Sequence, residues 1–130
     1  MSKKHHLTKL AGVPVVIWDD AQSLLKDIPR TVIKASVDAL QEWATSSNVP
    51  LVAAHARLLP DPESDWVQLG IELHLDVDDF ETGLEQQDEI SRLLGRAARG
   101  LPSQDRDIFD DRVSVLVYWA DDVWDDEPAL

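Results

Sequence analysis

Three side chains near the middle of the chain are of types that transfer protons or bind metal ions. Glu72 and His74 stand two residues apart in a run that alternates strictly between apolar and polar residues, so both are expected on one face of a β-strand. His55 lies in the preceding apolar run, which we expect to pair with that strand and to place His55 across from Gly70, diagonal to Glu72. These residue types suit an acid–base pair or a divalent-metal site.

The spacing of these residues also argues against a reactive site. Neighbours on one face of a strand lie about 6.5–7 Å apart, so ligation by residues i and i+2 requires bent side chains. We therefore favour a solvated or dimer-facing surface with ordinary polar residues, and keep a small enzyme or metal-binding site as the alternative. Neither a metal site nor a cofactor is predicted. Arg57, Asp76 and Tyr118 are expected on the same face.

The chain ends in an apolar run followed by tryptophans among acidic residues, VSVLVYWADDVWDDEPAL. Trp119 continues the expected last strand and is predicted to be half-buried. Trp124, set among aspartates, has the composition of an anchor for a cationic, partly apolar surface. The alternative, which we favour for the indole itself, folds Trp124 back against the sheet. The predicted partner-binding residues are Asp121, Asp122, Trp124, Asp125 and Asp126, with Asp78 and Asp79 as a second patch.

Acidic residues outnumber basic ones by 25 to 12, which gives a formal net charge of −13. Nucleic-acid phosphates would be repelled by this charge, whereas a basic protein would be attracted. Solubility alone is an equally good explanation of the acidity. The leading hypothesis is a small, non-enzymatic, cytoplasmic interaction domain that binds a basic protein partner, such as an immunity or antitoxin-like neutraliser. A structural homodimer subunit of a larger assembly is the third alternative.

The composition excludes several other kinds of chemistry. The chain has no cysteine, so disulfides and thiolate nucleophiles are impossible, and a reducing compartment is expected. Its five glycines are scattered singly, without the spacing of a phosphate-binding loop. No apolar run approaches the ~20 residues of a membrane span, and the N-terminus lacks the apolar stretch of a signal peptide. A cytoplasmic protein without a membrane partner is predicted.

Hydrophobic periodicity predicts the elements that position these residues. Alternating and β-branched runs predict strands over residues 13–18, 51–59, 67–77 and 113–119. Helical spacing predicts helices over residues 29–45 and 78–101, with a possible helical turn at 21–26 and a polar connector at 103–112. This order predicts an α+β fold: a ferredoxin-like βαββαβ sandwich with a four-stranded antiparallel sheet and both helices on one face. Residues 1–12 are expected to be a flexible basic N-terminus, 13–120 a single domain and 121–130 an acidic tail.

Details of these elements make further predictions. Asp78 and Glu81 have the form of a capping box at the start of the second helix. In the last strand, the valines at 113, 115 and 117 are expected to face the core. The opposite, helix-free face is then less polar than a freely solvated one, which makes dimerisation through the sheet a plausible alternative. Its expected members are Leu51, Ala53, His55, Gly70 and Leu116.

Overall fold

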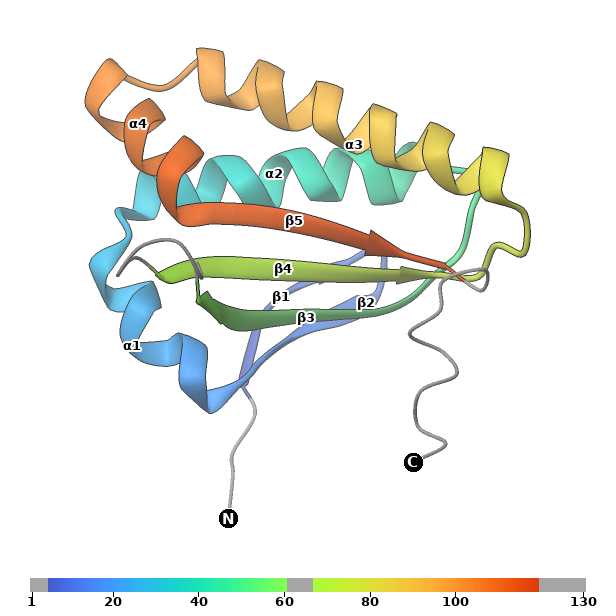
Figure 1. Ribbon diagram of the computed structural model, residues 1–130, viewed down its shortest axis with the longest axis horizontal. Helices are drawn as coiled ribbons and strands as arrows, with labels where there is room; N and C mark the ends of the chain where they lie inside the picture. Colours follow the sequence, from blue (N-terminus) through green and yellow to red (C-terminus); the bar gives the residue numbers. More distant parts are fainter. Residues whose placement is uncertain (1–4, 61–66, 120–130) are drawn as a thin grey trace.

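The structure, a computed structural model, describes residues 5–60 and 67–119 (Figure 1). Five strands and four helices follow one another within these ranges. In chain order they are β1 (His5–Leu10), β2 (Val13–Ile17), α1 (Asp19–Asp27), α2 (Arg30–Ser46), β3 (Leu51–Pro60), β4 (Val67–Leu75), α3 (Phe80–Arg99), α4 (Ser103–Arg112) and β5 (Val113–Tyr118).

The strands form one mixed sheet in the order β1-β2-β3-β4-β5. β1 and β2 form an antiparallel hairpin around Ala11 and Gly12, which both have positive φ, and β3 and β4 form a second antiparallel pair. β2 pairs with β3 in parallel, and so does β4 with β5. The strict alternation over residues 67–75 therefore does belong to a strand with one face on the core, as the sequence predicts.

The predicted four-stranded antiparallel, ferredoxin-like sandwich is wrong in two respects. Residues 5–10, expected to be flexible, add a fifth strand, because the turn at residues 11–12 returns the chain along β2 and Leu10 becomes fully buried. In addition, the two strands joined by each helical crossover are direct, parallel neighbours: β2 pairs with β3, and β4 with β5. In the predicted fold, another strand would lie between the two strands of each such pair. Hydrophobic alternation identifies strands and their faces but contains no information about their order.

The helical elements also differ from expectation in places. The possible turn at 21–26 is the longer helix α1, and the polar connector at 103–112 is the helix α4, which buries Phe109. α2 and α3 lie within two residues of their predicted bounds at every end. The cap of α3 is Asp79, whose carboxylate accepts a hydrogen bond from the Thr82 amide at 2.9 Å, and not Asp78 as predicted.

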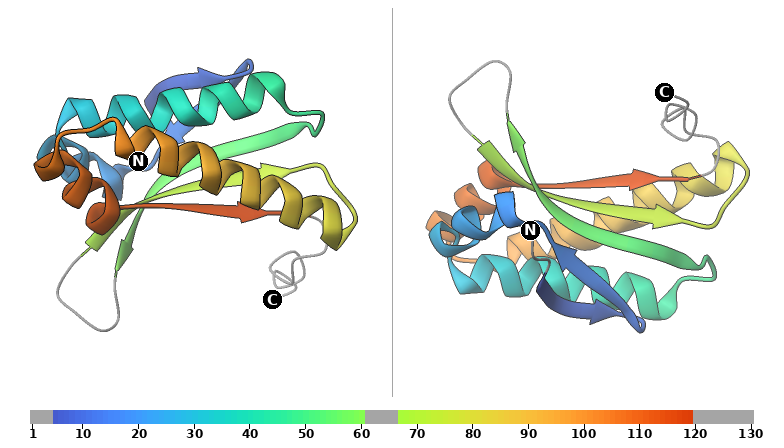
Figure 2. Two further views of the ribbon diagram at one scale, coloured as in Figure 1. Left: turned by 90° about the horizontal axis from the view of Figure 1, so that it is seen from above. Right: turned by 90° about the horizontal axis from the view of Figure 1, so that it is seen from below.

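The two long helices α2 and α3 pack side by side over one face of the sheet, and α1 lies at one end of it (Figures 1 and 2). The two parallel strand pairs run in opposite directions, and both crossovers step across the sheet in the same sense. Because the helices of both crossovers lie on the same face, the two connections must have opposite hands. One of the two connections is therefore left-handed, a form that is rare between parallel strands.

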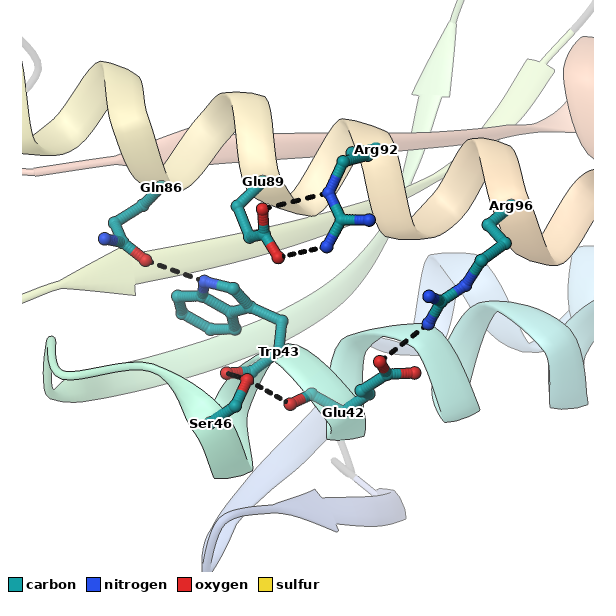
Figure 3. Close-up of polar contacts among 7 residues, drawn as sticks. All are labelled: Glu42, Trp43, Ser46, Gln86, Glu89, Arg92 and Arg96. Atoms are coloured by element: carbon teal, nitrogen blue, oxygen red, sulfur yellow. Dashed lines mark hydrogen bonds and ion pairs between the residues drawn. The ribbon is translucent and has the colours of Figure 1, made fainter.

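Contacts between α2 and α3 hold this helical layer together (Figure 3). Trp43 of α2 is 1% exposed, and its indole nitrogen donates a hydrogen bond of 2.8 Å to the Gln86 amide oxygen on α3. Glu42, the residue before Trp43 on α2, forms a 2.6 Å ion pair with Arg96 of α3. Arg92 and Glu89 form a 2.6 Å ion pair within α3. Apolar burial around Trp43 supplies most of the stabilisation, because exposed ion pairs contribute little.

We predict that Gly83→Ala destabilises the protein, because a Cβ at this position would overlap the buried Trp119 ring. Ordinary helix propensity would favour alanine by about 0.5–1 kcal/mol, whereas overpacking costs about 1–3 kcal/mol. Urea unfolding should show a net loss of roughly 1–2 kcal/mol. Gly100→Ala, whose Cβ would make only ordinary contacts, is the matched control and should be close to neutral. Equal stability of the two variants would contradict the packing described at Trp119.

Candidate functional site

The face of the sheet opposite α2 and α3 carries a row of aromatic rings. Figure 2, right, shows this face, and among the described residues no helix packs across it. Trp18 follows β2, His55 lies on β3, His74 on β4 and Tyr118 on β5, so each of four neighbouring strands contributes one ring. All four side chains are half-buried. We call this set the ring row.

Trp18 and His55 are joined by a directional contact at one end of the ring row. The Trp18 backbone amide continues the β2–β3 pairing with a hydrogen bond to the Ala56 carbonyl. This places the indole beside β3, where its Nε1–H donates to His55 Nδ1 at 3.1 Å. Because Nδ1 accepts this bond, the neutral His55 ring carries its proton on Nε2. The contact therefore fixes both the position and the tautomer of His55.

The other two rings of the row follow from the strand register. His74 lies opposite Tyr118 in the parallel β4–β5 pair, and their rings stack with centroids 5.1 Å apart. His55 meets His74 edge to face across the β3–β4 pair, with centroids 5.6 Å apart. These separations are in the range in which aromatic pairs attract one another. The row is thus continuous from Trp18 to Tyr118.

Two charged side chains lie beside the ring row. The Arg57 guanidinium sits over the Trp18 ring, 5.2 Å from its centroid, at the distance of a cation–π contact. Glu72 has one carboxylate oxygen 3.8 Å from Arg57 and the other 3.9 Å from His74 Nε2. Both distances exceed those of hydrogen bonds, so the carboxylate acts on its neighbours through its charge. The Glu72 side chain is 13% exposed, whereas that of Arg57 is 44% exposed.

The predicted candidates His55, Glu72 and His74 are brought together, but through a different register. His55 lies directly opposite Glu72, and Arg57 takes the place opposite Gly70. The prediction was wrong by two residues because the turn between β3 and β4 could not be located from composition alone. Arg57 and Tyr118 are on the expected face, whereas Trp18 was missed. The alternation of β2, with Val15 and Ile17 buried, was the available signal that Trp18 points away from the core.

Other predictions about this face have mixed outcomes. The valines of β5 pack against the core, and Trp119 is buried rather than half-buried. Leu51 also packs against the core, contrary to expectation, because the register shifts between Leu51 and Ala53.

The side chains of the ring row and its charged neighbours are aromatic, cationic and anionic groups from four strands. In the part of the chain that the structure describes, no three His, Asp or Glu side chains are grouped so that they could hold a metal ion. The site thus combines four rings, tilted by 23–87° to their neighbours, with one guanidinium and one carboxylate.

The predicted partner-binding residues fall into two groups. Asp121, Asp122, Trp124, Asp125 and Asp126 lie outside the described residues. Asp78 and Asp79 are exposed at the start of α3, where Asp79 has a structural role as the N-cap. Hydrogen bonds from the backbone and side chain of Thr82 hold the pKa of Asp79 below its usual value.

Outside the ring row, the structure has a hollow between the two long helices. A shallow groove of about 420 Å³ lies between α2 and α3, floored by Ala35, Ala39, Leu93 and Ala97. No helix among the described residues has both the length and the apolar composition that crossing a bilayer requires. A comparison of the chain with protein families, curated proteins and solved structures finds no match.

Two substitutions of Asp79 should distinguish its role as a hydrogen-bond acceptor at the start of α3 from the effect of its negative charge. Asp79→Ala removes the acceptor for the Thr82 amide and should lower the melting temperature by a few degrees. Asp79→Asn retains an acceptor and should recover most of that loss at neutral pH. Because the folded-state pKa of Asp79 is lowered, its contribution is complete above the ordinary aspartate pKa and is lost as the pH falls through the folded value. If Asp79→Ala and wild type melt alike from neutral to acid pH, the cap makes no contribution.

The tautomer of His55 provides a direct test of the ring row. In nitrogen-15 NMR spectra of the neutral imidazole, we expect the His55 proton on Nε2 in the wild type. Trp18→Phe keeps an aromatic ring but removes the donor, so proton occupancy on Nδ1 should rise. Thr45→Ser, on the outer surface of α2, is the control that should leave the signal unchanged. A wild-type protein with the proton on Nδ1 would contradict the Trp18–His55 hydrogen bond.

Proposed function

We propose that this chain is a protein-interaction domain that binds a basic protein partner through the helix-free face of its sheet. The observation that carries the proposal is the ring row, a continuous line of half-buried rings across four strands. Tryptophan, tyrosine and arginine are the residue types that dominate binding energy at protein interfaces. Trp18, Arg57 and Tyr118 supply all three on one surface.

The side chains of the ring row are already ordered by contacts with one another. Trp18 is held by its hydrogen bond to His55 and by Arg57, and Tyr118 is stacked on His74. Immobilising a flexible side chain on binding costs about 0.5–1.5 kcal/mol, so a surface that is ordered beforehand loses less. This supports a role in rigid, specific recognition.

Charge supports a basic partner. Asp19 and Asp20 follow Trp18 directly, and Asp76 stands two residues after His74, so exposed acids flank the ring row near both ends. The whole chain carries −13. A field of this sign accelerates the approach of a cationic protein, while the buried contacts set how long it stays. The contact between Arg57 and Trp18 also illustrates that these rings accept a guanidinium.

Ala53 offers a test that leaves the core intact. It lies opposite His74 on β3, half-buried on the helix-free face. A photo-crosslinking amino acid placed at residue 53 should capture a basic protein in the native cell, and the same group at Thr45 on α2 should not. With that protein purified, Ala53→Arg should weaken binding by roughly thirtyfold, the effect of losing a binding hot spot.

The direction of the charge effect makes this experiment specific. Ala53→Glu adds comparable bulk but the opposite charge, so it should cost much less affinity than Ala53→Arg. Raising the salt concentration should narrow the difference between the two variants, because salt screens exposed charges. Equal losses for both variants would contradict a basic partner. Unchanged affinity in both would show that the partner binds elsewhere.

A further inference from the structure

β5 forms one edge of the sheet of described residues, and its sequence lacks the charges and proline that often protect an edge strand. β1 and β5 are the two edge strands of the described sheet. The pairing of β1 with β2 is interrupted by a register shift between His6 and Lys9, which is a common protection against further pairing. β5 has the sequence VSVLVY, with no charge, proline or glycine. An uncharged, β-branched edge is a template for another strand.

A groove runs along this edge of the sheet. It has a volume of about 280 Å³ and lies between α3, α4 and β5. Ile90 and Leu94 of α3, Phe109 of α4, and Val115 and Val117 of β5 provide its apolar lining. A strand added to β5 would direct alternate side chains into this groove, because side chains of neighbouring strands share a face.

The same side of α3 carries two exposed apolar residues. Phe80 is 60% exposed and Leu84 is 37% exposed, and among the described residues only Val52 is another large hydrophobic exposed to this degree. Successive steps of three or four residues from Phe80 lead through Leu84, Gln87 and Ser91 to Gly95, and the last three line the groove. This side of α3, which we call the strip, therefore has apolar side chains at Phe80 and Leu84 and small or polar residues at Gln87, Ser91 and Gly95.

We propose that a second copy of this chain covers this strip, with β5 of one copy paired antiparallel to β5 of the other across a two-fold axis. A two-fold axis perpendicular to the sheet keeps both helical layers on the same side and places α3 against its counterpart in the antiparallel sense. Residues of like face then meet across the axis, valine against valine on the core side. Gly95, at which an added Cβ would meet only the Arg99 guanidinium at 3.8 Å, permits close approach of the two helices.

The charge distribution along α3 favours this partner. Acidic residues occupy its first half and arginines its second half: Glu81, Glu85, Asp88 and Glu89, then Arg92, Arg96 and Arg99. Antiparallel packing sets the acidic half of one helix beside the basic half of the other. Asp88 is the residue after Gln87, which lines the groove, and the Arg99 guanidinium lies close to Gly95. Asp88 and Arg99 are therefore adjacent to the strip. Arg92 and Arg96 are paired within the chain, with Glu89 and Glu42, so Asp88 of one copy and Arg99 of the other are the charges that would pair across the axis.

The dimer would extend the binding face described above. Two five-stranded sheets joined at β5 form one continuous sheet, with both ring rows on the same helix-free side. Tyr118, the ring nearest the joint in each copy, would bring the two rows together. A partner with two basic sites could then be bound by both rows at once, with a gain from effective concentration.

Sedimentation equilibrium of the full chain is the primary test. We expect a monomer–dimer equilibrium in the micromolar range for the wild type. Gly95→Glu adds bulk and charge at the helix crossing and should shift the midpoint at least tenfold towards monomer, without lowering the melting temperature of the dilute protein. Thr45→Glu adds the same charge on the far surface of α2 and should leave the midpoint unchanged. A wild type that stays monomeric throughout would overturn the proposal.

Charge reversal distinguishes this interface from any other. Asp88→Arg and Arg99→Asp should each weaken the dimer by roughly three- to tenfold, the range expected for exposed ion pairs present twice by symmetry. The double variant should recover affinity, because the two charges exchange roles across the axis. A dimer that is insensitive to Gly95→Glu, or a double variant weaker than either single one, would show that the copies pair through another surface.

Discussion

The packing of α2 against α3 on a single face of the sheet is the constraint on which the rest of the structure depends. Two crossovers of opposite hand converge on this layer, and the buried Trp43 with its hydrogen bond to Gln86 ties the helices together. Were the crossovers of the same hand, the helices would lie on opposite faces and cover the sheet twice. Because they share one face, the other remains available to polar and aromatic side chains.

Because no described helix packs on the second face of the sheet, aromatic and charged side chains can lie together there. Each strand alternates, so burying Val15, Ala54, Leu73 and Val117 on the helical side leaves Trp18, His55, His74 and Tyr118 on the other. The four rings are linked by one hydrogen bond and three ring contacts, and Glu72 lies 3.8 Å from Arg57. Contacts among these side chains therefore order the helix-free face, although no second layer packs on it among the described residues.

Sequence patterns identified the parts of the fold that depend on local physics. Periodicity located α2, α3 and the strands from β2 onward, and alternation assigned the valines of β5 to the core. It could not supply the order of the strands, since parallel and antiparallel neighbours bury the same residues. It also missed β1, whose only strong signal is the buried Leu10, and misplaced the register of His55 by two residues. His55, Glu72 and His74 could therefore be predicted as site residues from the sequence. The position of Trp18 beside His55 could not, because it depends on the parallel pairing of β2 with β3.

Single-cysteine labelling measures directly whether one face of the sheet is covered and the other open, and the chain has no native cysteine to interfere. Ala53 and Ala54 are neighbours on β3 that face opposite sides, the first half-buried and the second 1% exposed. The structure predicts rapid reaction of a thiol reagent with Ala53→Cys and strong protection of Ala54→Cys under native conditions. Equal rates at the two positions, or protection of both, would contradict a sheet covered by helices on one face alone.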